Sequence, residues 1–182
     1  MENTKWIAFF SQTGAEIADL SEKLGRWPDR IITNSRPEHI RTIDPRILKR
    51  NFWTLSNKPN ADNYLDIFQY FPDALITLHG WLRIIPPSVT EGVNIFNGHP
   101  GLITKYPELK GKDPQVRAFE GKYSEIGAVI HSVIAGVDEG KVIAWDSILN
   151  DNFTLDETYD RLKEISLKLW IKFLKKYLDF DV

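Results

Sequence analysis

The chain has 182 residues, 42% hydrophobic and 26% charged, which fits one globular domain with a sizeable core. It contains no cysteine, which excludes disulfides, thiolate catalysis and cysteine-based zinc sites, and its net charge of −2 argues against bulk attraction to nucleic acid or anionic membranes. No apolar run approaches the ~18 residues that span a bilayer and no signal peptide opens the chain, so we expect a cytoplasmic protein.

The first part of the chain has the pattern of a strand, a loop, a helix and a second strand. Trp6–Phe10 is a continuous apolar run, as in a strand covered on both faces of a parallel sheet. The polar stretch Ser11–Gly14 follows it, and apolar residues from Ile17 to Leu24 recur at helical spacing. Arg30–Asn34 then predicts the next strand, so the segment forms a βαβ unit with a polar loop opening its helix.

The middle of the chain predicts an irregular region and two more strands. Residues 37–63 carry several prolines and asparagines and predict irregular structure with one short helix. Tyr64–Phe71 reads as a helix that Pro72 closes. Ala74–Leu78 and Gly92–Asn97 predict the third and fourth strands.

The last part predicts a short helix, two strands and a long amphipathic helix, at residues 115–120, 125–133, 140–146 and 155–177. Thr154 or Asp156 is the expected N-cap of the long helix. Alternating strands and helices predict a single Rossmann-like α/β domain over residues 1–182, with a mainly parallel twisted sheet flanked by helices. Ligands of such sheets bind at the carboxyl ends of the strands, where Ser11, His79 and Asn97 fall.

Three polar residues carry the strongest chemical signal. Asn97 and His99 lie in Asn-Gly-His-Pro, and Asp138 lies in a Gly-Val-Asp-Glu-Gly turn. An amide can donate to a developing oxyanion, an imidazole can exchange a proton near neutral pH, and a carboxylate can set the charge of that imidazole. The set therefore suits attack of an amine on a carbonyl carbon.

The order of these motifs resembles the folate-dependent formyltransferase family. Asn97–Pro100 is similar to the family's Asn-x-His-Pro, and Val137–Gly140 is similar to its aspartate turn. His131 stands where the family carries a histidine, and Leu109–Pro114 is also similar. The resemblance extends from residue 6 to about residue 145. The family includes glycinamide ribonucleotide transformylases, sugar N-formyltransferases and the catalytic domain of methionyl-tRNA formyltransferases.

The resemblance implies transfer of a formyl group from 10-formyltetrahydrofolate to an amine, without a metal. Asn97 and a protonated His99 would stabilise the oxyanion. Asp138 would raise the pKa of His99 and help move the amine proton. We expect His131 to be a packing or supporting residue and His39 to be exposed.

The resemblance also places the folate pocket and the acceptor loop. The expected folate-binding residues are Leu82, Arg83, Ile85, Ile134, Ala135, Gly136 and Val137. Of Trp81, Leu82, Ile84 and Ile85, at least two should be core residues. The expected acceptor-binding residues are Ser11, Gln12, Thr13, Gly14 and Glu16.

The acceptor loop departs from the ribonucleotide transformylases, which hold a phosphate on a Gly-Asn-Gly-Ser-Asn-like loop. Here Glu16 introduces a carboxylate, which disfavours a phosphate unless the side chain turns away. Arg36 is a further candidate phosphate ligand. The departure argues against ordinary glycinamide ribonucleotide as the acceptor.

The sequence thus predicts an N-formyltransferase for a small, phosphorylated amine, with an amino nucleotide favoured. Alternatives are a divergent glycinamide ribonucleotide transformylase, a nucleotide-sugar N-formyltransferase, and a hydrolase of formyltetrahydrofolate. A silent folate- or nucleotide-binding module is the alternative of another class. No tRNA or membrane partner is expected, and a homodimer is compatible with the pattern.

Overall fold

The protein is described by a computed structural model over residues 4–178, and it contains one seven-stranded sheet of order β3-β2-β1-β4-β5-β6-β7. The strands are β1 (Trp6–Phe10), β2 (Arg30–Thr33), β3 (Phe52–Thr54), β4 (Leu75–Leu78), β5 (Asn94–His99), β6 (Glu125–Ser132) and β7 (Val142–Leu149). The helices are α1 (Ala15–Leu24), α2 (Pro45–Leu48), α3 (Ala61–Tyr70), α4 (Pro114–Glu120) and α5 (Leu155–Tyr177). Short 3-10 turns lie at Pro37–Thr42, Pro87–Val89 and Pro107–Leu109.

Strands β1 to β5 pair in parallel, and β6 and β7 continue the sheet antiparallel. The chain runs from β1 outward to β2 and β3, then returns to the other side of β1 for β4 and β5. The order reverses between β1 and β4, which is where open α/β sheets bind ligands. The predicted α/β fold with its mainly parallel sheet is confirmed. The predicted domain limits, 1 and 182, lie outside the described residues.

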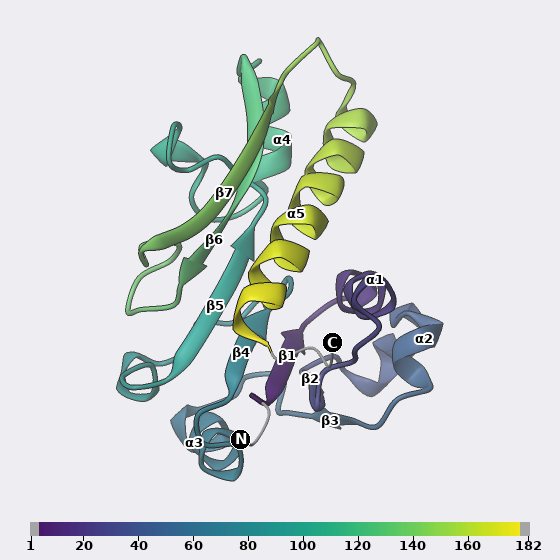
Figure 1. The fold of residues 1–182 in the computed structure, drawn as a ribbon, viewed down its shortest axis with the longest axis vertical. Helices are drawn as coiled ribbons and strands as arrows, with labels where there is room; N and C mark the ends of the chain where they lie inside the picture. Colours follow the sequence, from purple (N-terminus) through teal and green to yellow (C-terminus); the bar gives the residue numbers. More distant parts are fainter. Residues whose placement is uncertain (1–3, 179–182) are drawn as a thin grey trace.

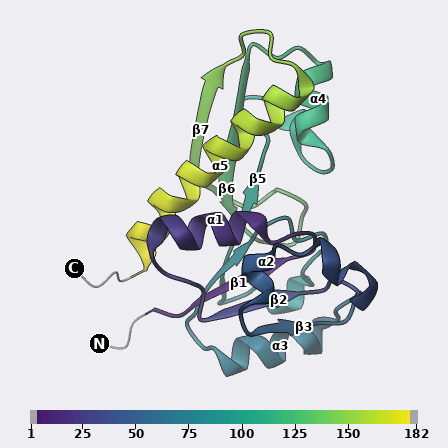
Figure 2. The same cartoon turned by 90° about the vertical axis from the view of Figure 1, so that its right-hand side faces the viewer.

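Helices cover both faces of the sheet (Figures 1 and 2). On one face α1 and α5 lie side by side, and on the other α3 covers the parallel strands. The alternation of β1 explains this, because Trp6, Ala8 and Phe10 join the core beneath α1 and α5, whereas Ile7 and Phe9 join the core beneath α3. Both sets are fully buried, as the continuous apolar run predicts.

The long helix α5 begins at the predicted N-cap and is anchored by one tryptophan. The Thr154 and Glu157 side chains form a reciprocal capping box. Trp170 is fully buried and packs on β5 at Gly98, where an added Cβ would lie 2.6 Å from its Nε1. Only glycine therefore fits at this position of β5. None of the helices formed by residues 4–178 is both long and apolar enough to cross a membrane.

The irregular prediction for residues 37–63 is wrong in two places. Phe52–Thr54 forms the edge strand β3, paired in parallel with β2. With three residues, β3 is too short to show a period in the sequence. Helix α3 starts at Ala61 rather than Tyr64, because Asn60 and Asn63 form a capping box. In addition, β7 extends to Leu149, three residues beyond the predicted end.

The Trp170 packing predicts a large loss of stability on truncation. Trp170→Ala should lower the free energy of unfolding by about 3–5 kcal/mol, because it empties a fully buried site between α5 and the sheet. Trp145→Ala is the matched control, since Trp145 is 58% exposed on β7 and should cost less than about 1 kcal/mol. Urea unfolding measures both, and equal losses would contradict the assigned packing.

Candidate active site

The end of β5 presents Asn97 and His99 on one face of the sheet, because residues two apart in a strand point the same way. Gly98 faces the opposite side, toward Trp170. The antiparallel neighbour β6 places His131 directly opposite Asn97. The order Asn-Gly-His in β5 and the pairing with β6 therefore bring an amide and two imidazoles to one patch of the sheet.

Asp138 reaches this patch from the turn between β6 and β7. Its backbone has a φ of 55°, a left-handed conformation that aspartate tolerates better than most residues. One carboxylate oxygen, Oδ2, lies 3.2 Å from His99 Nδ1 and accepts the Gly111 N–H at 2.8 Å. The other, Oδ1, lies 3.2 Å from His131 Nε2 and 3.5 Å from Asn97 Nδ2. A single buried carboxylate thus sits between two imidazoles.

Backbone carbonyls fix one proton on each ring. His99 Nε2 lies 2.9 Å from the Leu109 carbonyl oxygen, and His131 Nδ1 lies 2.9 Å from that of Ser132. Because a carbonyl only accepts, both of these nitrogens carry a hydrogen. The second nitrogen of each ring faces Asp138. Asp138 and the two rings can therefore exchange a proton among themselves.

Burial and hydrogen bonds shift the pKa values of both His99 and Asp138. Burial lowers the pKa of His99 below its ordinary value, although Asp138 and the Leu109 carbonyl oppose that shift. Burial raises the pKa of Asp138, but the His131 hydrogen bond, the His99 charge and the Gly111 N–H outweigh it, and this pKa is lowered. Asp138 raises the pKa of His99, as predicted, but burial is the larger effect, so the net shift of this pKa is downward. The lowered pKa of Asp138 keeps its carboxylate ionised at neutral pH, with the Nδ1 of His99 facing it.

His131 contributes more than packing. It is buried, contacts Asp138, and its Nε2 lies 3.1 Å from Asn97 Nδ2, so it connects the amide to the carboxylate. One feature of the sequence marks this position, a histidine at the end of a strand that precedes the aspartate turn. Only the β5–β6 register shows that it faces Asn97.

The residues expected to bind folate divide into exposed and buried ones. Trp81 and Ile85 are buried in the core, as predicted for at least two of that segment. Apolar side chains that stay exposed are Leu82, Ile84, Ile134 and Val137. Val137 directly precedes Asp138 in the chain. Ala135 is also exposed, and Gly136 is half-buried.

The expected acceptor loop lines a cavity of about 560 Å³ at the ends of the parallel strands. Its walls come from the loops after β1, β2, β3 and β4: Ser11, Gln12, Thr13, Asn34, Ser35, Arg36, His39, Thr42, Asn57, Leu82 and Arg83. No carboxylate is among these residues, although the chain as a whole is acidic. Gly14, at φ 71°, ends the loop as the N-cap of α1.

Seven residues of this cavity lie outside the set predicted for the acceptor and its phosphate, and two of them, Arg83 and Asn34, offer polar groups to a ligand. Among the described residues Arg83 donates to neutral acceptors only, the Asn57 carbonyl and side-chain oxygens and the Leu82 carbonyl. Asn34 is buried, and its Nδ2 donates to the Asn57 carbonyl at 3.3 Å. Its Oδ1 has no hydrogen-bond partner among the described residues. Asn34 directly follows β2 and no motif marks it in the sequence, whereas Arg83 lies in the segment after β4 that is expected to bind folate.

Glu16, the remaining residue of the predicted acceptor set, turns away from the cavity. Its carboxylate lies 2.7 Å from His79 Nδ1 and 2.6 Å from Ser166 Oγ, and it is not part of the cavity wall. The loop Ser11–Gly14 is therefore free of the carboxylate that disfavours an anion there.

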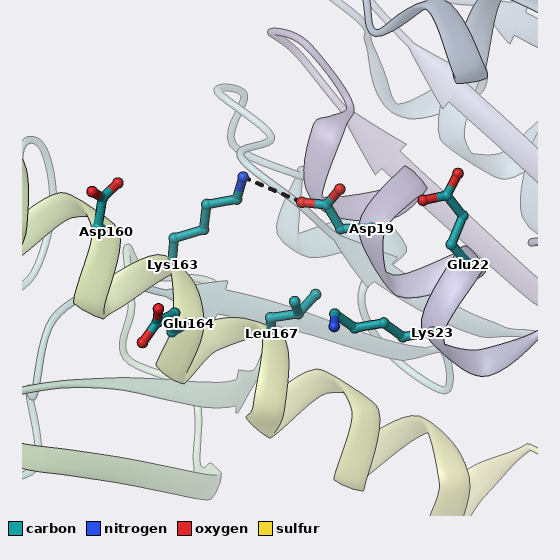
Figure 3. A pocket seen from close by; sticks show the side chains of 7 residues that line it. All are labelled: Asp19, Glu22, Lys23, Asp160, Lys163, Glu164 and Leu167. Atoms are coloured by element: carbon teal, nitrogen blue, oxygen red, sulfur yellow. Dashed lines mark ion pairs between the residues drawn. The ribbon is translucent and has the colours of Figure 1, made fainter.

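A second cleft, of about 590 Å³, runs between α1 and α5 (Figure 3). It is open, and charged side chains dominate its walls, with an ion pair between Lys163 and Asp19 at 3.2 Å. None of the residues that form it belongs to the Asn97–Asp138 patch. We therefore do not assign it to the active site. Within residues 4–178 no cluster of histidine, aspartate and glutamate is arranged to hold a metal ion.

Because burial lowers the pKa of His99, we expect the stability of the protein to depend on pH. As pH falls below about 6.5, the ordinary pKa, the unfolded chain takes up a proton that the folded protein resists. The free energy of unfolding should therefore fall with pH until the lower folded-state pKa is passed. His99→Gln should flatten this dependence, whereas His39→Gln, at an exposed position, should keep it. Urea unfolding between about pH 5 and 8 is the test, and an unchanged slope in His99→Gln would refute it.

The chain is similar in sequence to known proteins. The family model described as "Formyl transferase" matches residues 33–174. A phosphoribosylglycinamide formyltransferase of Bacillus subtilis is 30% identical over 110 residues, which is 59% of this chain and 55% of that protein. The chain spans about half the length of the curated relatives it matches first.

Solved structures share the fold. The phosphoribosylglycinamide formyltransferase of Anaplasma phagocytophilum has a TM-score of 0.81 at 17% identity, over 96% of this chain and 86% of that one. A formyltetrahydrofolate deformylase of Pseudomonas syringae has a TM-score of 0.75 at 16% identity, over 96% of this chain and 61% of that one. With the family match covering most of its length, this chain belongs to the formyl transferase family.

Proposed function

We propose that the protein transfers the formyl group of 10-formyltetrahydrofolate to the amine of a small phosphorylated acceptor, with an amino nucleotide favoured. The observation that carries the proposal is the buried Asp138 carboxylate between His99 and His131, beside Asn97. This cluster holds an ionised proton acceptor and an amide donor within a few ångströms of each other. A silent binding module has no need of both.

The residues divide the work of amine attack on a carbonyl. Asn97 Nδ2 has two hydrogens, and its contact with Asp138, at 3.5 Å, is long, so one N–H can turn to the formyl oxygen as negative charge develops there. The amine loses a proton as it attacks, and the Asp138–His99 pair takes it up. The Nδ1 of His99 faces Asp138, so the pair can hold that proton and then return it to the departing nitrogen.

10-Formyltetrahydrofolate would supply the formyl group. The exposed apolar side chains Leu82, Ile84, Ile134 and Val137 suit the flat ring of a folate, because such surface is rarely left to water without a ligand or partner. Ile85 is buried and offers its backbone rather than its side chain. In this arrangement the formyl group would lie near Asp138, which follows Val137 directly.

The acceptor would occupy the cavity beside the Ser11–Gly14 loop. Its wall carries Arg36 and Arg83 and no carboxylate, and Arg83 is held only by neutral oxygens, so its charge is left for an anion. A volume of about 560 Å³ fits a nucleotide-sized molecule. We therefore give the Arg83 side chain to the acceptor and the backbone of its segment to folate.

Several finer points remain proposals. The curated relatives are phosphoribosylglycinamide formyltransferases and a methionyl-tRNA formyltransferase, so glycinamide ribonucleotide is the first alternative acceptor. A nucleotide sugar is the second, and water, which would make the protein a hydrolase, is the third. The cytoplasmic location, the homodimer and the lack of a tRNA acceptor stay predictions.

The direct assay follows release of tetrahydrofolate from 10-formyltetrahydrofolate against amino nucleotides, amino sugars and glycinamide ribonucleotide. Turnover that depends on one of these amines supports the transferase, and amine-independent release identifies a hydrolase. Folate binding with no turnover of any kind would overturn the proposal in favour of a silent module.

Removal of the carboxylate should abolish most turnover. Asp138→Asn should lower kcat by about 100-fold or more, because the amide cannot accept the amine proton. Asp156→Asn is the matched control, an aspartate in the first turn of α5 that is exposed and distant in the chain from the site. Steady-state kinetics with circular dichroism as a fold check measures both. Near-normal turnover in Asp138→Asn would contradict its role.

Loss of the Arg83 charge should weaken acceptor binding rather than chemistry. Arg83→Gln should raise the acceptor KM about tenfold, the value of one charge-assisted hydrogen bond, with little change in kcat. Arg161→Gln is the control, since Arg161 pairs with Glu164 on the surface of α5. If the KM for folate rises in Arg83→Gln and that for the acceptor does not, the assignment of this side chain is wrong.

A further inference from the structure

A second carboxylate–imidazole contact lies beneath the site loops and is not used in the proposed chemistry. Ser166 Oγ lies 2.6 Å from Glu16 Oε1, and Glu16 Oε2 lies 2.7 Å from His79 Nδ1. The other nitrogen of His79 lies 2.9 Å from Thr77 Oγ1. That hydroxyl oxygen accepts a hydrogen bond from Trp6 Nε1 at 2.8 Å. The chain of bonds joins α5, α1, β4 and β1.

The donors and acceptors of this network fix its protons. The Trp6 indole only donates, so Thr77 Oγ1 accepts from it. The Thr77 hydroxyl hydrogen then has His79 Nε2 as its acceptor among the described contacts. His79 therefore carries its hydrogen on Nδ1 and donates it to Glu16, while the Ser166 hydroxyl donates to the other carboxylate oxygen. Burial raises the pKa of Glu16, but the His79 and Ser166 hydrogen bonds outweigh it and the pKa is lowered.

The network does not itself provide a reaction centre. Hydroxyl, imidazole and carboxylate follow one another as in a nucleophilic triad. However, Thr77 is fully buried and the His79 side chain is only 1% exposed, so no substrate reaches the hydroxyl. The arrangement has to act through what it holds in place.

Two site segments adjoin this network. Glu16 stands two residues after Gly14, which ends the acceptor loop. His79 precedes Gly80, whose carbonyl accepts the Ser11 N–H at 3.3 Å, and the Ser11 hydroxyl accepts the Leu82 N–H at 2.9 Å. The loop after β1 and the segment after β4 are thus bonded to each other, and each is followed or preceded within two residues by a member of the Glu16–His79 contact.

Helix α5 connects the network to the catalytic strand. Trp170 lies one turn beyond Ser166, and its ring is 4.6 Å from that of His79. The same indole packs on Gly98, between Asn97 and His99. Ser166 and Trp170 therefore fix the acceptor loop, the folate segment and β5 against one rigid helix.

We propose that Glu16 and His79 are positioning residues, which with Ser166 hold the Ser11–Gly14 loop and the Gly80–Arg83 segment at the separation that acceptor binding requires. The inference rests on the proposed function for the identity of the reaction. How rigidly the two segments are held, however, can be measured without any turnover. It also gives Glu16 a place in specificity: its carboxylate is held toward α5, so the cavity wall stays free of negative charge.

Two substitutions of Glu16 separate positioning from charge. Glu16→Ala removes both hydrogen bonds, whereas the amide of Glu16→Gln can accept from His79 Nδ1 and donate to Ser166 Oγ. Glu16→Ala should raise the acceptor KM about tenfold and change kcat less than about threefold, and Glu16→Gln should stay near wild type. Asp19→Ala, one turn along α1, is the matched control, because it removes ion pairs with Arg46 and Lys163 but neither hydrogen bond of Glu16.

Hydrogen exchange of the ligand-free protein is the readout that needs no acceptor. In Glu16→Ala the amides of residues 11–14 and 80–83 should exchange faster, while those of α3, on the opposite face of the sheet, should not change. Ser166→Ala, which removes one bond only, should give a smaller effect of the same pattern if Glu16→Ala does not fold.

The outcomes are distinct. Faster exchange confined to the two segments supports positioning even if no amine is turned over, a result that would overturn the proposed function alone. A lower melting temperature with uniform exchange and an unchanged acceptor KM would mean a merely structural contact and would overturn the inference. Loss of acceptor affinity in Glu16→Gln equal to that in Glu16→Ala would also overturn it, because charge would then be the cause.

Discussion

The packing of Trp170 on Gly98 is the constraint on which the site depends. The indole packs on Gly98 on one face of β5 and holds the strand against α5, while Asn97 and His99 point to the other face. The same ring contacts His79, so α5 packs against the end of β4 and against β5 through one side chain. A helix that is one of the last elements in the sequence thereby determines the geometry of residues about seventy positions earlier. Any residue larger than glycine at position 98 would displace the helix or the strand.

Two carboxylate–imidazole contacts lie near each other in the fold and differ in what surrounds them. Asp138 lies between two imidazoles, and the second nitrogen of each ring faces the carboxylate, so a proton can pass between the three groups. Glu16 has one imidazole and one hydroxyl as partners, and the far nitrogen of His79 meets the fully buried Thr77, so the ring joins two parts of the fold. The first arrangement suits chemistry and the second suits support, although their residue types are the same.

Much of the fold could be predicted because its signals are local: apolar runs mark the buried strands, and Thr154 with Glu157 marks the start of α5. The trio Asn97, His99 and Asp138 was predictable from motif order, yet the lowered pKa of His99 was not, since burial depends on contacts such as that with Leu109. Nor does spacing reveal that Glu16 faces a serine 150 positions away. Edge strand β3 was missed because three residues show no period.

The most direct test of the central claim follows a carbon-13 label in the formyl group of 10-formyltetrahydrofolate by NMR, with the amine that supports turnover. The account predicts that the label appears as a formamide on that amine and that the Asp138→Asn protein leaves it on the folate. A label that ends as free formate, or that is transferred equally well without the Asp138 carboxylate, would contradict the account.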